Sequence, residues 1–179
     1  MIDHVIYNLA RRRTFFFPLG IIIMLLLGRP TWPTYIAGMA IVVLGEVSRF
    51  WAAGYIRKAV ELTSSGPFGS VRNPLYVGSF IMTLGFIVVS NSLAVAAFAL
   101  ILFCALHTSA ILYEERELSK IFGEEYAEYC RSVPRLIPRW PMGGPEQFSW
   151  RQALDNSEHK SALFAAVVAA AFAAKLFLR

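Results

Sequence analysis

The sequence predicts an all-α fold: a polytopic membrane helix bundle of about five transmembrane helices, with amphipathic helices on its cytosolic face. Two observations favour this class. Of the 179 residues, 56% are hydrophobic and only 16% are charged, a more apolar composition than that of soluble domains. The basic residues also lie at the ends of apolar runs, as the positive-inside bias of membrane proteins requires. The length is that of a single domain, residues 1–179.

The first two predicted spans are Phe15–Gly28 and Tyr35–Tyr55. The first has 14 residues, short of the roughly 20 that a 30 Å hydrocarbon core requires, so it crosses with local thinning of the bilayer. The second carries Glu46 and Arg49, three residues apart and therefore on one helix face. Ionisable residues in a span usually line a cavity or meet a partner. Simple pairing of these two at the headgroup level is the alternative, and both interpretations stay open.

Three further apolar runs follow. Leu75–Ser90 and Leu93–Tyr113 are joined by Asn91-Ser92, a joint so short that it predicts an antiparallel helical hairpin. The second of these runs contains His107, and a lone histidine in a span is more often a packing residue than a catalyst. The fifth run, Ser161–Leu178, either crosses the membrane or lies against it.

Between the fourth and fifth runs the chain becomes highly charged. Residues 114–131 (the Glu segment) have apolar side chains at helical spacing, which predicts two amphipathic helices hinged at Gly123. Two prolines, Pro134 and Pro138, end this helical region. Residues 141–179 then form a C-terminal linker and helix, with a short polar helix expected over Trp150–His159.

The charge distribution predicts an orientation. With five spans and a cytoplasmic N-terminus, the basic residues on the outside are only Arg29, Lys175 and Arg179, and the other fourteen of the 17 are inside. This asymmetry predicts an integral membrane protein, of the bacterial inner membrane, with its functional face in the cytoplasm. The formal net charge of +5 is spread over the span ends, so it does not indicate nucleic acid as a partner.

Residues 62–78 (the motif loop) are the longest polar interval of the first two-thirds of the chain. Gly66-Pro67, Gly69 and Asn73-Pro74 are three helix breakers within nine residues, so no continuous helix passes through. Irregular backbone in a membrane protein survives only at the surface or along a polar cavity. The motif loop and the Glu segment share the cytoplasmic face in the predicted topology, and we expect them to meet.

Together these two polar regions predict a pocket with one wall in the lipid, suited to a water-soluble cofactor and a membrane-embedded substrate. Aromatic rings can stack on a planar base, carboxylates at the mouth of the fourth span can accept hydrogen bonds, and backbone amides near the loop glycines can hold a carboxylate. The residues concerned are Phe68, Tyr76, Tyr126 and Tyr129, then Glu114 and Glu115, then Gly66 and Gly69. The two cysteines, Cys104 and Cys130, form no CxxC pair, so no metal site is predicted.

Two linked motifs lie within residues 55–139. The first is Arg72-Asn73-Pro74-Leu75-Tyr76-Val77-Gly78, and the second is Glu114-Glu115-x-x-Leu118-x-x-x-Phe122-Gly123-x-x-Tyr126-x-x-Tyr129-x-x-x-Val133, followed by Ile137-Pro138. With these motifs at the family's separation, the chain resembles the isoprenylcysteine carboxyl methyltransferase and phospholipid N-methyltransferase superfamily over residues 55–139.

The resemblance implies an integral membrane enzyme that uses S-adenosylmethionine to methylate a lipid or lipophilic small molecule. Carried over by position, the cofactor-binding residues are Val60, Glu61, Leu62, Thr63, Phe68, Asn73, Pro74, Leu75, Tyr76 and Glu114. Two departures bear on the substrate. Asn73 replaces the family's histidine, and Ala110 replaces an arginine that the prenylcysteine enzymes are taken to use for the substrate carboxylate. Prenylcysteine is therefore a doubtful substrate.

The implied reaction is direct methyl transfer, in which the protein mainly positions the reactants. A carboxylate acceptor requires no base, whereas an amine or a hydroxyl does, and the candidate bases are Glu115, Glu46 and His107. Two alternatives come from other classes: a nicotinamide-dependent membrane reductase of the sterol-reductase type, and a non-catalytic membrane scaffold. Oligomeric state is not predicted by the sequence.

Overall fold

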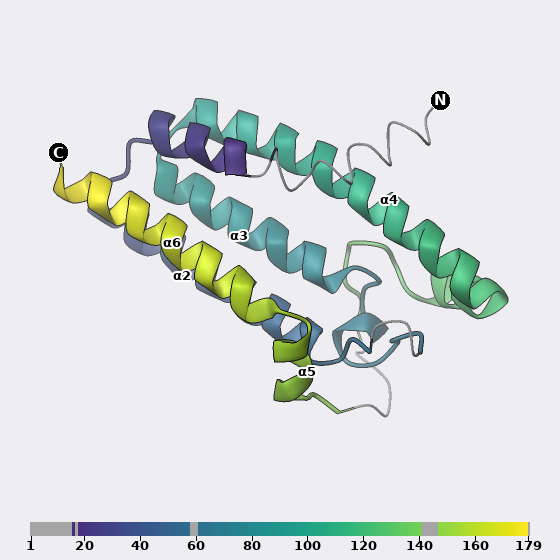
Figure 1. Ribbon diagram of the computed structural model, residues 1–179. Helices are drawn as coiled ribbons and strands as arrows, with labels where there is room; N and C mark the ends of the chain where they lie inside the picture. Colours follow the sequence, from purple (N-terminus) through teal and green to yellow (C-terminus); the bar gives the residue numbers. More distant parts are fainter. Residues whose placement is uncertain (1–15, 17, 58–60, 141–146, 179) are drawn as a thin grey trace.

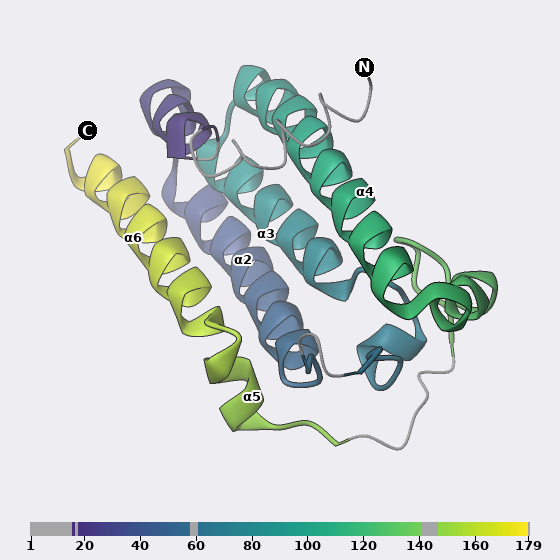
Figure 2. The same cartoon turned by 45° about the vertical axis from the view of Figure 1, so that its right-hand side comes forward.

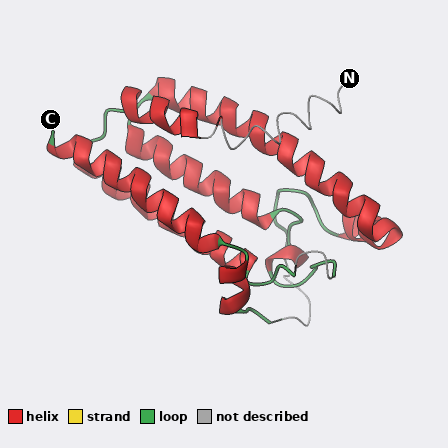
Figure 3. Ribbon diagram, in the orientation of Figure 1, coloured by secondary structure: helices red, strands yellow, loops and turns green. Residues whose placement is uncertain are grey.

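The computed structural model describes residue 16 and residues 18–57, 61–140 and 147–178. Every regular element in these ranges is helical (Figure 3), which confirms the predicted all-α class. The elements are a short helix Pro18–Leu27, α2 Trp32–Ala53, a 3₁₀ turn η1 Pro67–Gly69, α3 Pro74–Ser90, α4 Leu93–Ser132, α5 Trp150–Asp155 and α6 Glu158–Phe177.

Five apolar helices make up the bundle. Figures 1 and 2 show α6, α2, α3 and α4 following one another in that order, with the Pro18–Leu27 helix beside the end where α3 turns into α4. Among the described helices, α2, α4 and α6 are long and apolar enough to cross a membrane, and Pro18–Leu27 and α3 are shorter apolar helices. This arrangement is consistent with the predicted bundle of about five spans.

The contact between α2 and α3 is built on paired glycines. A Cβ atom added to Gly38 would lie 2.5 Å from the carbonyl oxygen of Gly85, and one added to Gly45 would lie 2.7 Å from that of Gly78. Small residues at such a crossing let two backbones approach closely, which favours association through van der Waals packing in lipid. These two helices form the rigid centre of the bundle.

Local sequence signals set the turns between the spans. Thr31, which directly follows Pro30, forms a capping box with Thr34 at the start of α2. Asn91 adopts a left-handed conformation with φ 47°, and the hydroxyl of Ser92 accepts a hydrogen bond from the amide of Val95. The predicted tight hairpin between α3 and α4 is therefore confirmed.

One predicted boundary was wrong, and another lies inside a longer helix. The apolar run predicted over Leu93–Tyr113 and the first part of the Glu segment form one helix, because α4 continues without a break to Phe122 and no helix breaker precedes Gly123. Its first 30 residues are about 45 Å long at 1.5 Å per residue, so the helix projects well beyond a 30 Å hydrocarbon core. The short helix expected over 150–159 ends at Asp155, because Ser157 takes a φ of 66° and α6 starts at Glu158.

Gly123 is the predicted hinge of the Glu segment, and the structure confirms it. Its φ of 53° and ψ of −120° are non-helical, and this combination is open essentially to glycine alone. Beyond it the chain turns back, which brings Tyr126, Tyr129 and Val133 into a small buried cluster.

Replacing Gly123 by alanine is expected to lower the free energy of unfolding by about 1–3 kcal/mol through backbone strain. A Cβ atom at this position would have no neighbour within 4 Å, so crowding contributes nothing. The measurement is the thermal midpoint in detergent, with Glu125→Ala as the control because Glu125 is an exposed helical residue nearby. Equal midpoints for the two variants would show that the turn at Gly123 tolerates a side chain.

Candidate functional site

The motif loop is irregular, as predicted, apart from the single turn η1. Gly66 opens the turn with a φ of 57° and lies against the ring of Tyr55. The amide of Gly69, which we expected to be available to a carboxylate, donates to the carbonyl oxygen of Gly66 over 3.2 Å. The turn therefore already uses this amide for its own geometry.

The motif loop and the Glu segment meet, which confirms the prediction drawn from their shared face. The hydroxyl of Tyr129 donates to the carbonyl oxygen of Phe68 over 2.8 Å. Two backbone hydrogen bonds extend the contact, from the Arg72 amide to the Pro134 carbonyl over 2.9 Å and from the Arg139 amide to the Ser70 carbonyl over 3.1 Å. Segments more than sixty residues apart thus form one surface.

Glu115 is the centre of this contact. The residue is 9% exposed, and its carboxylate accepts hydrogen bonds from Arg135 through Nε at 3.1 Å and Nη2 at 2.8 Å. Asn73 Nδ2 donates to the same carboxylate over 3.2 Å, and Arg72 Nη2 lies 3.6 Å from it. We call these four residues the Glu115 clamp. Hydrogen bonding to Glu115 raises the pKa of Arg135.

The neighbouring carboxylate, Glu114, points elsewhere. The hydroxyl of Tyr76, in the first turn of α3, donates to Glu114 Oε1 over 2.7 Å. The ring of Tyr76 makes an edge contact with His107, whose centroid is 5.6 Å away. His107 in turn stacks on Phe103, and its Nδ1 lies 3.1 Å from the Phe103 carbonyl oxygen. A carbonyl can only accept, so Nδ1 carries the proton and Nε2 is the basic nitrogen.

Tyr76, Glu114 and His107 all line a cavity of about 560 Å³. Its polar end consists of Arg49, Tyr76, Ser79, His107, Glu114, Lys160 and Ser161. Its other wall residues are mostly apolar and come from the Pro18–Leu27 helix, α3, α4 and α6: Gly20, Ile21, Met24, Leu75, Met82, Thr83, Phe86, Phe98, Ala99, Leu102, Phe103, Leu106, Ala110, Phe164 and Ala165. A hollow with one polar end and apolar walls matches an amphiphile.

The predicted cofactor residues are distributed over this region. Leu75, Tyr76 and Glu114 line the cavity, and Asn73 belongs to the Glu115 clamp. Leu62 packs against Tyr126, Tyr129 and Val133. The remaining described residues of the set are Glu61, Thr63, Phe68 and Pro74. Of these, Glu61 forms an ion pair with Arg57 over 2.9 Å. Val60 lies outside the described residues.

The three candidate bases are in different places. Of Glu46, His107 and Glu115, only His107 lines the cavity. Glu46 accepts a hydrogen bond from the Ser161 hydroxyl over 3.2 Å on the α2–α6 contact, and Glu115 is held in its clamp. No Glu46–Arg49 ion pair forms, because Arg49 pairs with Glu158 of α6 instead.

The site contains residues that sequence reasoning did not assign. Arg72 and Arg135 belong to the clamp, and Arg49 and Lys160 belong to the polar end. Arg49 had been singled out as an ionisable residue in a span. No periodicity or spacing identified the others, because their partners are far away in sequence. No group of three or more potential metal ligands occurs among the described residues.

Comparison with known proteins assigns the chain to a family. The phospholipid methyltransferase profile matches residues 32–125, just over half of the chain. The chain belongs to the phospholipid methyltransferase family. The predicted membership of the superfamily of membrane methyltransferases is thereby confirmed. The matched segment of this family member runs from α2 through the motif loop and α3 to the turn at Gly123, and it ends before Arg135 and α6.

The curated relatives of this chain include proteins named for metal resistance and proteins named as methyltransferases. The chain is 34% identical over 128 residues to the nickel-cobalt-cadmium resistance protein NccN of Alcaligenes xylosoxydans, covering 66% of the chain and 60% of the relative. It is 40% identical over 104 residues to the cobalt-zinc-cadmium resistance protein CzcN of Cupriavidus metallidurans, covering 57% and 48%. It is 32% identical over 108 residues to the protein-S-isoprenylcysteine O-methyltransferase of Schizosaccharomyces pombe, covering 60% and 45%. The chain thus spans about half the length of these relatives. No solved structure gives a significant match.

Proposed function

We propose that this protein is an integral membrane methyltransferase that uses S-adenosylmethionine to methylate a lipid or lipophilic small molecule at a carboxylate or an amine. The observation that carries the proposal is the junction of Tyr76 and Glu114 at the polar end of an apolar cavity. These residues come from the two halves of the family motif, so the implied cofactor site lies at the polar end of the cavity that would hold an amphiphilic acceptor. We further propose that this polar end faces the cytoplasm of a bacterial inner membrane.

The residues present fit this cofactor. Arg72 Nε is buried and, within the described part of the chain, donates to no acceptor, as expected of a donor that awaits a carboxylate. Glu114 provides a carboxylate for hydroxyl or cationic groups, and the rings of Phe68 and Tyr76 offer faces for a base. When bound, the cofactor supplies an electrophilic methyl group on a sulfonium. The Glu115 clamp holds the motif loop in place beside it.

The acceptor atom determines what the protein must do. A carboxylate acceptor would need no base, because its oxygen would take the methyl group as the carbon–sulfur bond broke, leaving a neutral thioether, and no proton would move. An amine would have to lose a proton as well, and His107 is the candidate base that lines the cavity, with its Nδ1 against the Phe103 carbonyl oxygen. Glu46 and Glu115 lie away from the cavity wall, so we propose His107 for this role.

The test is methyl transfer by the purified protein in detergent, with methyl-labelled S-adenosylmethionine and a lipid extract of the host. We expect label in a lipid-soluble product and its loss in Glu114→Ala. Binding of NADPH in place of S-adenosylmethionine would support the reductase alternative. Binding of neither would support the scaffold alternative, and either result would overturn the proposal.

We expect substitution of Glu114 to weaken cofactor binding more than substitution of Tyr76 does. Glu114→Ala should weaken S-adenosylmethionine binding by roughly 10- to 100-fold, the scale of a hydrogen bond to a charged group, and Tyr76→Phe by about 3- to 10-fold. Titration calorimetry measures both. Glu117→Ala is the control, since Glu117 makes only an exposed ion pair with Lys120. An unchanged affinity in Glu114→Ala would remove Glu114 from the proposed cofactor site.

A further inference from the structure

The polar end of the cavity has two sides of opposite character. Tyr76, His107 and Glu114 come from α3 and α4, and Glu114 is the carboxylate of that side. Arg49 and Lys160 come from α2 and α6 and are its two cations. The proposed cofactor is cationic at the sulfonium, so the carboxylate side suits it. The cationic side suits an anionic group of the acceptor.

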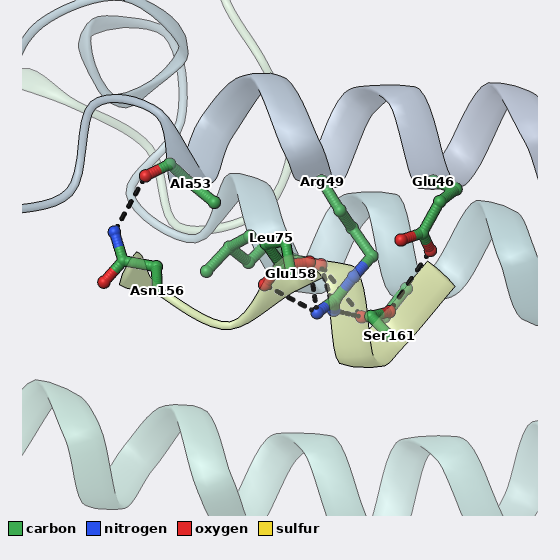
Figure 4. A network of polar contacts seen from close by, with 8 residues as sticks. Glu46, Arg49, Ala53, Leu75, Asn156, Glu158 and Ser161 are labelled. Atoms are coloured by element: carbon green, nitrogen blue, oxygen red, sulfur yellow. Dashed lines mark hydrogen bonds and ion pairs between the residues drawn. The ribbon is translucent and has the colours of Figure 1, made fainter. Parts of the chain in front are cut away.

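Arg49 positions α6 against the cavity (Figure 4). Its Nη2 lies 3.0 Å from each carboxylate oxygen of Glu158, and its Nη1 donates to the Ser79 hydroxyl and the Leu75 carbonyl oxygen. Figure 4 shows Arg49 extending from α2 to the first turn of α6, with Ser161 meeting Glu46 beside it. Because Arg49 is already paired, its main effect is to fix the start of α6.

Lys160 is the second cation at the polar end of the cavity. It follows Glu158 by two residues, is exposed and lines the cavity. Its amino group has no hydrogen-bond or ion-pair partner within the described part of the chain. On the α4 side of the cavity, Ala110 contributes a methyl group and no charge. The unpaired positive charge of the polar end is therefore on α6.

We propose that Lys160 binds an anionic oxygen group of the acceptor, a carboxylate or a phosphate, and so determines which amphiphiles enter the cavity. This inference rests on the proposed function, and it places a specificity-determining residue outside the segment 32–125 that the family profile matches. An ammonium beside an apolar wall attracts an anionic headgroup whose chain lies along that wall. The hydroxyls of Ser79 and Ser161 lie at the same end, but they already donate to the Leu75 carbonyl oxygen and to Glu46, which leaves Lys160 as the available cation.

The experiment measures amphiphile binding without cofactor or turnover. The probe is 11-(dansylamino)undecanoate in nonionic detergent, compared with its methyl ester, and dodecyl phosphate is the competitor. We expect the protein to bind the carboxylate about tenfold more tightly than the ester, the scale of one charge-assisted hydrogen bond. Lys160→Arg should keep this preference, and Lys160→Glu should abolish it. Lys120→Glu is the matched control, because Lys120 is an exposed lysine away from the cavity.

Each outcome has a separate meaning. Displacement of the probe by dodecyl phosphate at a lower concentration than by dodecanoate would identify phosphate as the preferred group. Equal affinity for acid and ester, or an unchanged preference in Lys160→Glu, would overturn the inference and leave Lys160 as an anchor to lipid phosphates. Methyl transfer without charge preference would uphold the proposed function alone. Charge-selective binding without methyl transfer would uphold the inference about Lys160 and reject the proposed function.

Discussion

Glu115→Ala is expected to lower the free energy of unfolding by about 3 kcal/mol and to abolish cofactor binding. Removing one partner of a buried ion pair typically costs about 3–5 kcal/mol, because the remaining charge is left without compensation. The lower figure applies here, because the Arg135 side chain is 49% exposed and can be hydrated after the substitution. The cost remains large because the Arg72 side chain is only 12% exposed and its charge would be left without a partner. The loss also removes one of the two acceptors of the Asn73 side-chain amide, at the residue that directly precedes α3; the other acceptor is the Arg135 carbonyl oxygen.

The measurement is the thermal midpoint in detergent together with limited proteolysis across the motif loop. We expect the loop to become cleavable in Glu115→Ala at a temperature at which the wild-type protein is resistant. Glu124→Ala is the control, because Glu124 makes an exposed ion pair with Arg131 and such pairs contribute about 0–1 kcal/mol. If Glu115→Ala behaves like Glu124→Ala, the clamp does not hold the loop.

The second large effect is expected at the glycine contact between α2 and α3. A Cβ atom at Gly38 would lie within 2.7 Å of the backbone nitrogen of Val89 as well as close to Gly85, and neither backbone can move without separating the helices. Overpacking commonly costs about 1–3 kcal/mol, and Gly38→Val should exceed this range because it adds three carbons against backbone atoms. We expect little folded protein to be recovered.

The matched control is Ala40→Val, a change of similar size at an exposed position of the same helix. Size-exclusion chromatography after detergent extraction measures the folded, monodisperse fraction. Recovery of Gly38→Val at the level of Ala40→Val would mean that α2 and α3 can separate at little cost, contrary to the close packing in the structure.

Short-range features were predictable from the sequence because they depend on local backbone chemistry. The turn at Asn91-Ser92, the hinge at Gly123 and the irregular motif loop each follow from residues that favour or forbid particular φ and ψ values. The meeting of the motif loop with the Glu segment was also predictable, since charge asymmetry places both on one face. Glu114 and Tyr76, which the family resemblance assigns to one cofactor wall, are joined by a hydrogen bond in the structure.

Long-range partners were not predictable in the same way. Arg49 could pair with Glu46, three residues away on its own helix, yet it pairs with Glu158, 109 residues later in the chain. The choice depends on how α6 is rotated against α2, which no periodicity of a nearly uniform Ala-rich run specifies. Arg135 likewise reaches Glu115 only because Gly123 reverses the chain. The cavity depends on all of these placements together.

The lysine near the end of α6 has a consequence for how the protein is made. Lys175 Nζ donates to the carbonyl oxygens of Leu25 and Leu26 over 2.6 and 3.1 Å, so it satisfies the C-terminal end of the Pro18–Leu27 helix from a position 150 residues later. Both helices contribute walls to the cavity. Since the Pro18–Leu27 helix is made first and α6 last, these cavity walls come together only after the rest of the described chain has been synthesised, and a chain truncated before α6 would lack one of them.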